Sequence, residues 1–459
     1  MTESDPETAD LDEPSTHDDD APTLPARAIE TLSDRGYRYV TTPQELEECV
    51  ADLQGTRVLA ADIEGDSFFS YTEKTCLLQM TGDSGMDWVV DPLAVPDLEP
   101  LRELMESPDV IKIFHGADYD VVSLKRDHGF QISPIWDTMI AAQATGHERF
   151  GLSDLVLQYF GDKLDKKYQR HDWSHRPLLP EHLGYARLDS HYLPRLREIL
   201  MEAAEAQDRG EMLAEEFMLL ESREWTGRPF DPDSCLKVKG ANKLDEVGKR
   251  VLRALFVVRD EIAARKNRPA FKVWGNDANL KIARARPADQ EQLIDALGPK
   301  SHIARRHGVV VLEAVAAGRK DTTPIPAKKE STTPRTSPEV PIYTRDDEPL
   351  FGALKLWRNA RADEAQLTPA MIVNNTVLRH IAALKPTTLA DFALIDEMRV
   401  WQVQGFGDEI LSLVTSWQAN NPTSSTEETS GKRRRRRRRR RGGDEGAAEP
   451  DSEQGSVSS

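Results

Sequence analysis

The chain has 459 residues, of which 39% are hydrophobic and 30% are charged, and this length suits two to four domains joined by polar segments. It has no run of about 18 apolar residues, no basic and apolar leader and only three scattered cysteines, so we expect no membrane span, no signal peptide, no disulfide or zinc framework, and a cytoplasmic location. The net charge of −18 hides a separation of opposite charges along the chain, because residues 1–25 are acidic and residues 432–441 are an unbroken basic run.

The N-terminal half predicts an α/β domain over 35–222, after an acidic segment, 1–30, that we expect to be disordered. Its expected elements are strands at 57–64, 76–80, 87–91 and 110–114, a helix at 98–105 and a helix that starts at Asp120. From about residue 138 the pattern is mainly helical. Strands that alternate with helical patterns are typical of an α/β sheet.

The C-terminal half predicts all-α structure. A connector, 223–240, is followed by several short amphipathic helices over 241–319 and again over 345–420. The linker between them, 320–344, is rich in Thr, Pro, Ser and Lys. The last segment, 421–459, has low complexity and is expected to be disordered.

Acidic residues in three separated contexts form the candidate site. Asp62 and Glu64, at the end of a predicted strand, should share one face because strand side chains alternate with period 2. Asp120 should open a helix, where the helix dipole favours an acid. Tyr185 and Asp189 are four residues apart and should share one face of a helix. Carboxylates gathered in this way need a cation between them, and a site without His or Cys clusters suits Mg²⁺ or Mn²⁺.

Each member also has a structural alternative. An Asp-x-Glu after a strand is common, Tyr and Asp four apart are usually only a helix face, and Asp120 alone fits a helix cap. His115 either touches substrate or is a structural histidine, and Asp137 is expected to cap a helix. Gln169, Trp173 and Arg176 either line a substrate path or, for Trp173 above all, belong to the core.

The motifs Asp62-x-Glu64, His115-Gly-Ala-Asp-x-Asp and Tyr185-x-x-x-Asp189, in this order, resemble the DEDD exonucleases in the subgroup marked by Tyr. Residues 164–178 and 224–239 resemble ribonuclease D, and the resemblance covers about 35–420. It implies a ribonuclease H-like α/β exonuclease domain, with a mixed sheet and flanking helices, followed by two small all-α HRDC-like domains. Such modules usually help to hold nucleic acid, and a scaffold is the alternative.

The resemblance also implies a reaction, two-metal hydrolysis of a phosphodiester at a 3′ end that releases nucleoside 5′-monophosphates. Asp62, Glu64 and Asp189 would hold the ion that activates water, and Asp62 would bridge to a second ion that Asp120 also binds. Tyr185 would orient the water. The expected substrate is structured RNA such as tRNA precursors. A DNA exonuclease and an inactive nucleic-acid-binding scaffold remain alternatives.

The basic run Arg433 to Arg441 cannot fold alone, because like charges repel. As a solvated tether it would neutralise phosphates without reading sequence. It could instead pair with the acidic residues 1–25, and in a eukaryote it would resemble a nuclear-localisation patch.

Overall fold

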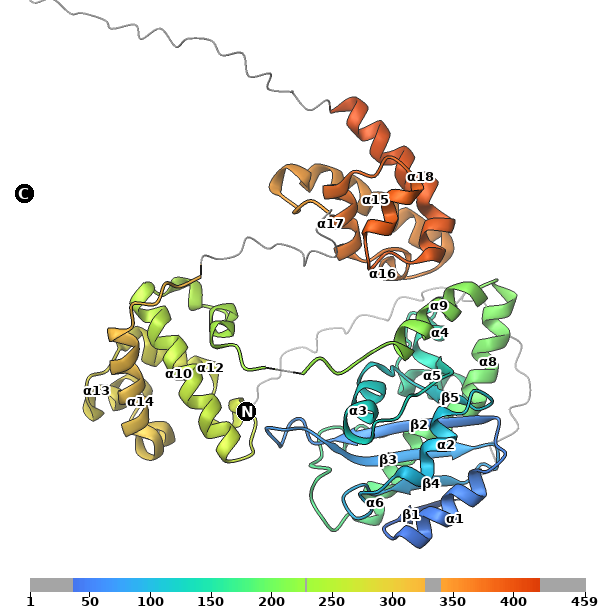
Figure 1. Ribbon diagram of the computed structural model, residues 1–459, viewed down its shortest axis with the longest axis horizontal. Coiled ribbons are helices and arrows are strands. Elements are labelled where there is room, and N and C mark those ends of the chain that lie inside the picture. The colour runs from blue at the N-terminus through green and yellow to red at the C-terminus, as the bar shows by residue number, and fades with distance from the viewer. Residues whose placement is uncertain (1–35, 228, 327–339, 422–459) are drawn as a thin grey trace, which may run out of the picture.

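The computed structural model describes residues 36–227, 229–326 and 340–421. It contains an α/β unit (37–221), a first helical unit (232–320) and a second helical unit (345–420), which are coloured blue to green, green to yellow-brown and orange to red in Figure 1. The acidic segment 1–30 and the arginine run both lie outside the described residues.

The α/β unit is built on a mixed six-stranded sheet with the order β1-β4-β3-β2-β5-β6. β2 is central, antiparallel to β3 and parallel to β5. Each predicted strand is present, whereas the short edge strands β1 and β6 had not been predicted. The strands are β1 (Tyr37–Val40), β2 (Val58–Gly65), β3 (Thr75–Gly82), β4 (Asp87–Val90), β5 (Ile111–Phe114) and β6 (Ile135–Asp137).

Helices cover both faces of this sheet. One face packs with the helices α1 (Pro43–Leu53), α2 (Arg102–Glu106) and α3 (Asp118–His128). The other packs with α4 (Thr138–Ala144), α5 (Leu152–Phe160), α8 (Leu193–Ala206) and α9 (Gly210–Glu221). The predicted helix at 98–105 is a 3₁₀ turn, η1 (Glu99–Leu101), that leads into α2. This mixed sheet with flanking helices confirms the predicted fold class.

The first helical unit does not consist only of short helices, as the sequence had suggested. Its two longest helices run for 20 and 19 residues, because no proline interrupts either one. Its elements are η2 (Pro232–Lys237), η3 (Ala241–Lys243), α10 (Glu246–Arg265), α11 (Ala270–Val273), α12 (Asn276–Ala285), α13 (Gln290–Leu297) and α14 (His302–Lys320).

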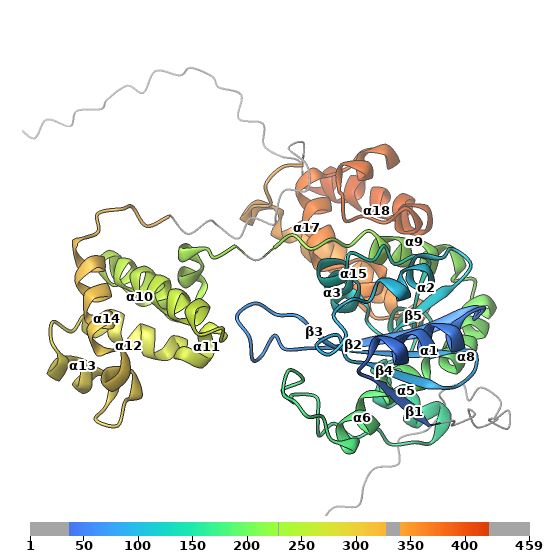
Figure 2. The same cartoon turned by 60° about the horizontal axis from the view of Figure 1, so that its bottom comes forward.

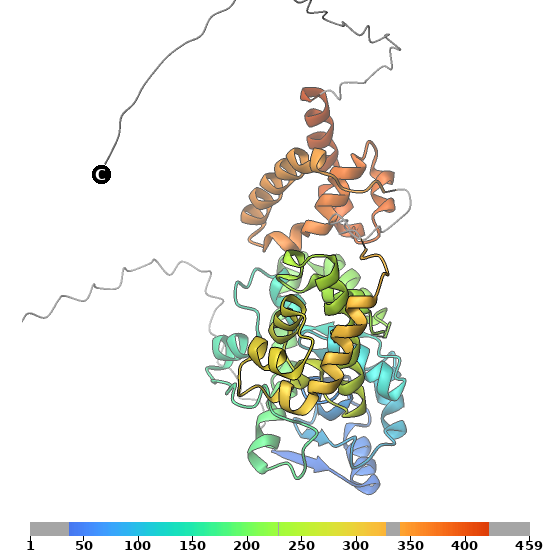
Figure 3. The same ribbon diagram turned by 90° about the vertical axis from the view of Figure 1, so that its left-hand side faces the viewer.

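The second helical unit repeats this plan, and its first and last α-helices run for 18 and 21 residues, so the prediction of short helices was wrong here too. Its elements are η4 (Arg345–Asp347), α15 (Glu348–Ala365), α16 (Pro369–Ile372), α17 (Asn375–Leu384), η5 (Leu389–Leu394) and α18 (Val400–Asn420). Figure 1 shows this unit beside α9 of the α/β unit, and Figure 3 shows it above the other two units. Within the described ranges, no helix has the length and apolar character that crossing a membrane requires.

Candidate active site

Asp62 and Glu64 lie on the central strand β2, where the period of two places them on one face, as predicted. The alternate residues Ala61 and Ile63 are buried in the core on the opposite face. Both carboxylates are half-buried. Because Asp62 and Glu64 both lie within the β2–β3 ladder, the backbone holds these two side chains in a fixed relation to each other.

Asp120 lies in the first turn of α3 and is buried, with 7% of its surface exposed. Its Oδ1 accepts a hydrogen bond from the backbone N–H of Ile63, at 3.1 Å. The ladder between β2 and β5 ends at Ala60, so this N–H lies beyond the last β5 pair and is satisfied by Asp120 instead. The hydrogen bond ties the α3 carboxylate to Ile63, the residue that separates Asp62 and Glu64 in the chain.

Asp137 holds the turn that leads into α3. Its Oδ1 accepts hydrogen bonds from Met139 N and Ile140 N, at 2.8 and 3.0 Å, which confirms the predicted cap. Its Oδ2 accepts from Gly116 N and Ala117 N, at 2.9 and 2.7 Å. Asp137 therefore caps α4 and also fixes the segment from which Asp120 projects, a second role that the sequence did not reveal.

Tyr185 and Asp189 lie on two short helices, α6 (Pro180–Ala186) and α7 (Leu188–His191), rather than on one continuous helix as predicted. The break falls at Arg187, which keeps helical dihedral angles, φ −57° and ψ −28°. The four-residue spacing therefore still places the two side chains near each other. The charge of Asp189 is among the causes that raise the pKa of Tyr185.

A polar network that the sequence had not revealed holds α7 against the sheet. Asp87 accepts hydrogen bonds from Arg187 Nη1, at 2.8 Å, and contacts His191 Nδ1, at 3.1 Å. The hydroxyls of Ser190 and Thr81 lie 2.9 Å apart. These residues flank Asp189 on both sides in the chain. The only signal in the sequence was the presence of the polar residues Thr81 and Asp87 in predominantly apolar strands.

The electrostatics of the site are those of crowded acids. Burial raises the pKa of Asp62 well above its usual range, and the charges of Asp120, Asp189 and Glu64 raise it further. The pKa of Glu64 is raised by burial and by two of the same charges. Burial is also the main reason that the pKa values of Asp120 and Asp189 rise to about 7. Among the described residues, no cationic side chain forms a salt bridge with any of the four.

These side chains fit a divalent cation by their chemistry, since all four are carboxylates and hard cations prefer oxygen ligands. Within the part of the chain that the structure describes, no three Asp, Glu, His or Cys side chains converge closely enough to enclose an ion as they stand. The acids are within electrostatic reach of one another, so the charge of an ion would relieve their mutual repulsion and draw them together.

Aromatic side chains form one wall beside Tyr185. The Trp173 ring stacks on that of Tyr185, with centroids 6.1 Å apart, and the Tyr168 ring meets it edge-on at 5.7 Å. Trp173 is only 1% exposed and packs in the core, so it supports the tyrosine and does not line an open path. Arg176 forms a two-pronged salt bridge with Asp91, at 2.6 and 2.8 Å, and is likewise structural.

His115 is half-buried, and its Nδ1 lies 2.8 Å from the hydroxyl of Thr138. Burial lowers its pKa to about 4, so the ring is neutral at physiological pH. The partner is a side chain rather than the backbone, and the structure supports the structural role over direct contact with substrate.

Comparison with known proteins identifies the family of each unit. The family model described as 3′-5′ exonuclease matches residues 37–205, and the HRDC domain model matches residues 248–315 and 347–414. The second match confirms that the two helical units are two copies of one module.

Ribonuclease D from Gluconacetobacter diazotrophicus is 30% identical over 379 residues, which are 82% of this chain and 92% of that protein. The catalytic core of RRP6 from Trypanosoma brucei is 28% identical, with a TM-score of 0.57 over 62% of this chain and 79% of that one. The structure of Escherichia coli RNase D shares the fold at 20% identity, with a TM-score of 0.61 over 83% of this chain and 99% of that one. The chain therefore belongs to the ribonuclease D family and is a 3′→5′ exoribonuclease.

Proposed function

We propose that the protein trims the 3′ ends of structured RNA, such as tRNA precursors, by hydrolysis that depends on two divalent cations, Mg²⁺ or Mn²⁺. The exonuclease family is divalent-metal dependent. The observation that carries the proposal is the set of mutually repelling acids, Asp62, Glu64, Asp120 and Asp189, with no salt bridge to a cationic side chain among the described residues. Such a set is costly to bury unless cations offset it.

We assign ion binding to the four acids and the orientation of water to Tyr185. Bound divalent cations would neutralise charge on the phosphate diester and lower the pKa of water. Asp62 feels the charges of the three other acids, so it would be the carboxylate that serves both ions. Glu64 and Asp189 would complete one ion's ligands and Asp120 the other's. The pKa of Tyr185 is raised, mainly by burial, so its hydroxyl stays protonated and orients water without removing a proton from it.

The assignment of structured RNA rests on two observations. The Gluconacetobacter diazotrophicus relative is a ribonuclease D, and the solved Escherichia coli RNase D is described as an exoribonuclease involved in structured RNA processing. All three cysteines are free and buried, which supports action in the reducing cytoplasm. A DNA exonuclease is the alternative, because no described contact identifies a group that would select a 2′-hydroxyl.

The test is a comparison of 5′-labelled RNA and DNA oligomers incubated with the protein and Mg²⁺ or Mn²⁺. The proposal predicts that RNA with a free 3′-hydroxyl shortens as a ladder, that a 3′-phosphate slows it, and that a tRNA with a 3′ extension is trimmed to a discrete length. Internal cuts in a circular RNA, or faster degradation of DNA than of RNA, would contradict it.

A further inference from the structure

The two helical units provide an internal comparison, because a constant offset along the chain relates their structural residues. Arg259 Nη1 donates hydrogen bonds to Trp274 O and Asn276 Oδ1, at 3.1 and 2.8 Å. Arg358 Nη1 donates to the carbonyl of Val373 and to Asn375 Oδ1, at 3.2 and 2.8 Å. The buried framework has thus been kept in both copies. Surface residues that differ at equivalent positions are not required by the fold of the module.

The surfaces at equivalent positions differ strongly in charge and aromatic content. The first unit exposes four cations at the end of α10 and the start of α14, and exposes Phe271 and Lys272 on α11. The corresponding residues of the second unit include no cation and no aromatic ring. The pairs are Arg265 and Glu364, Lys266 and Ala365, Phe271 and Ala370, Lys272 and Met371, Arg305 and Gln404, and Arg306 and Gly405.

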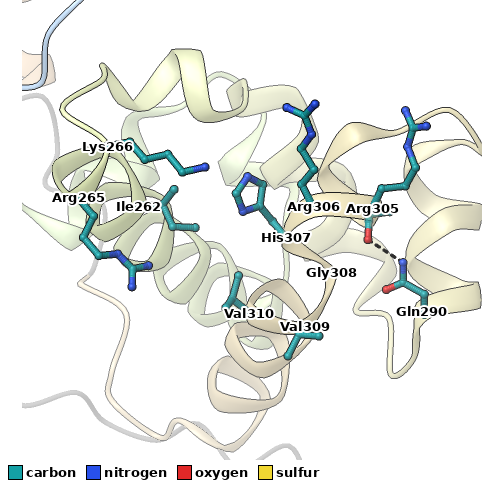
Figure 4. Close-up of a pocket in the computed structure, with 11 residues that line it drawn as sticks. Ile262, Arg265, Lys266, Gln290, Arg305, Arg306, His307, Gly308, Val309 and Val310 are labelled. Atoms are coloured by element: carbon teal, nitrogen blue, oxygen red, sulfur yellow. Dashed lines mark hydrogen bonds between the residues drawn. The ribbon is translucent and has the colours of Figure 1, made fainter.

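The four cations of α10 and α14 surround a cavity of about 430 Å³. Figure 4 shows Lys266, Arg305 and Arg306 projecting along one side of it around His307. Burial, and then the charges of Lys266, His302 and Arg306, lower the pKa of His307, so positive charge converges here. Within the described ranges, none of the four cations forms a salt bridge. Their positive charge is free to meet an anionic ligand.

The loop between β2 and β3, residues 66–74, reaches from the active-site strand towards α11 of the first helical unit (Figure 2). Tyr71 N donates to Asn267 Oδ1 at 3.2 Å, and the Tyr71 hydroxyl donates to Asp260 Oδ2 at 2.8 Å. Lys272 Nζ lies 3.5 Å from the centroid of the Phe69 ring. Asn267 directly follows Arg265 and Lys266, so the loop is anchored next to the cations.

Two phenylalanines remain exposed at this junction. Phe68 at the tip of the loop and Phe271 on α11 are each 57% exposed, although their chain neighbours Phe69 and Lys272 contact each other. Hydrogen bonds inside the loop fix its conformation, since the buried Asp66 accepts from Ser70 Oγ and Lys74 N, at 2.5 and 2.8 Å. Exposed aromatic rings held on an ordered frame beside a cationic surface offer a stacking surface to a ligand.

We infer that the single strand of RNA that leads into the active site crosses this junction, with bases stacked on Phe68 and Phe271 and phosphates on Arg265, Lys266, Arg305 and Arg306. A surface that combines aromatic rings with cations suits an unpaired strand, because every base has a face to stack and every phosphate a charge. The loop begins after Gly65, the residue next to Glu64, so the junction continues directly from the carboxylates. The inference rests on the proposed function and, of the two helical units, assigns RNA binding to the first.

The first test measures binding of an RNA of about 12 nucleotides. All proteins carry Asp62→Asn, so that the RNA is not degraded. Phe271→Ala introduces the residue that the second unit holds at the equivalent position, and the module therefore accommodates it. We expect Phe68→Ala and Phe271→Ala each to weaken binding on the order of tenfold, and Arg305→Gln to flatten the salt dependence. Leu356→Ala, at a 75% exposed position of the second unit, is the matched control and should bind normally.

The second test locates the stacked bases. An abasic residue is moved stepwise back from the 3′ end, and each RNA is tested with wild-type and Ala side chains at position 68. If Phe68 stacks on one base, its substitution should weaken every RNA except the one that is abasic at that base. Equal losses at all positions, or unchanged binding in both phenylalanine variants, would overturn the inference and leave the rings as a protein-docking surface. Failure of the wild-type protein to shorten RNA would instead refute the proposed function, so the two outcomes are distinguishable.

Discussion

The two helical units begin their last helices in different ways, and this difference determines how each meets the α/β unit. In the first unit, Ser301 caps α14 by accepting from Ala304 N. In the second unit, Val400 replaces this serine, and Glu215 of α9 accepts from Val400 N and Trp401 N, at 2.8 and 3.0 Å. A cap supplied by another unit turns a helix end into an interface.

Charged groups reinforce the interface of the second unit. Arg399 Nε donates to Glu216 Oε1 at 2.9 Å, next to the capping Glu215. The first unit has no such cap. Of the contacts described above, those with the 66–74 loop are the only ones that it makes with the α/β unit, and its four cations remain exposed. The second copy of the module therefore packs against the α/β unit, whereas the first copy keeps a surface that is open to a ligand. The predictions below test this division, starting with the largest effect.

The largest effect should arise outside both helical units. Asp62→Asn removes the ligand assigned to bridge two ions and should lower the rate about a thousandfold or more, even with metal saturating. RNA binding through the first unit should persist in this variant. Single-turnover hydrolysis and RNA affinity, measured side by side, check both statements. A rate near that of the wild type would exclude the two-metal assignment.

Tyr185→Phe should give the next largest effect. The ring still stacks on Trp173, but the hydroxyl that positions water is lost, so the chemical step should slow roughly 100-fold with little change in RNA affinity. Pre-steady-state kinetics with excess enzyme separates the two quantities. An unaltered single-turnover rate would mean that the tyrosine only packs.

Glu215→Ala should weaken docking of the second helical unit. It removes two hydrogen bonds to a helix end, and we expect a loss of about 1–3 kcal/mol. Faster proteolysis between the units and a larger radius of gyration in solution would report this loss. Glu211→Ala, at an exposed position of the same helix, is the control. If both variants behave alike, Glu215 does not hold the second unit.

The smallest effect concerns pH and metal. The folded-state pKa values of Asp120 and Asp189 are raised to about 7, above the unfolded value of about 3.9. Their contribution to stability is therefore complete below about pH 4 and is lost as pH rises towards 7. In a metal chelator, Asp189→Asn should raise the melting temperature by a few degrees at pH 8 but not at pH 4. Excess Mg²⁺ should reverse the order at pH 8, and equal melting temperatures in all conditions would contradict the raised pKa values.

Much of the fold was predictable because the local signals are strong. The apolar runs of β2, β3, β4 and β5 gave their strands, and the period of two placed Asp62 and Glu64 on one face. The strand β6 was missed because three residues are too short to show a period. Helix lengths in both helical units were underestimated, although Asp245 and Pro269 bracket α10 as a start and a stop signal. The boundaries 35–222, 241–319 and 345–420 stay predictions.

The residues of the candidate site could be predicted from the sequence, but the contacts that hold them in place could not. Motif order and residue type gave the five candidate residues, and in the structure the charges of the acids raise the pKa values of Asp62 and Tyr185. The interruption at Arg187 and the Asp87 network depend on contacts about 100 positions apart in the chain, which no local pattern encodes. The cap that Glu215 provides likewise joins residues that are more than 180 positions apart in the chain. Tertiary partners of this type become visible only when the chain is folded.

The central claim is that the acids of β2, α3 and α7 bind divalent ions that act on RNA. Its most direct test is a calorimetric titration of Mn²⁺ into the protein bound to an RNA whose 3′-terminal linkage resists hydrolysis. The account predicts two ions for each wild-type chain and fewer in Asp62→Asn, with the RNA bound equally well in both proteins. The same ion count in the two proteins, or none in the wild type, would contradict it.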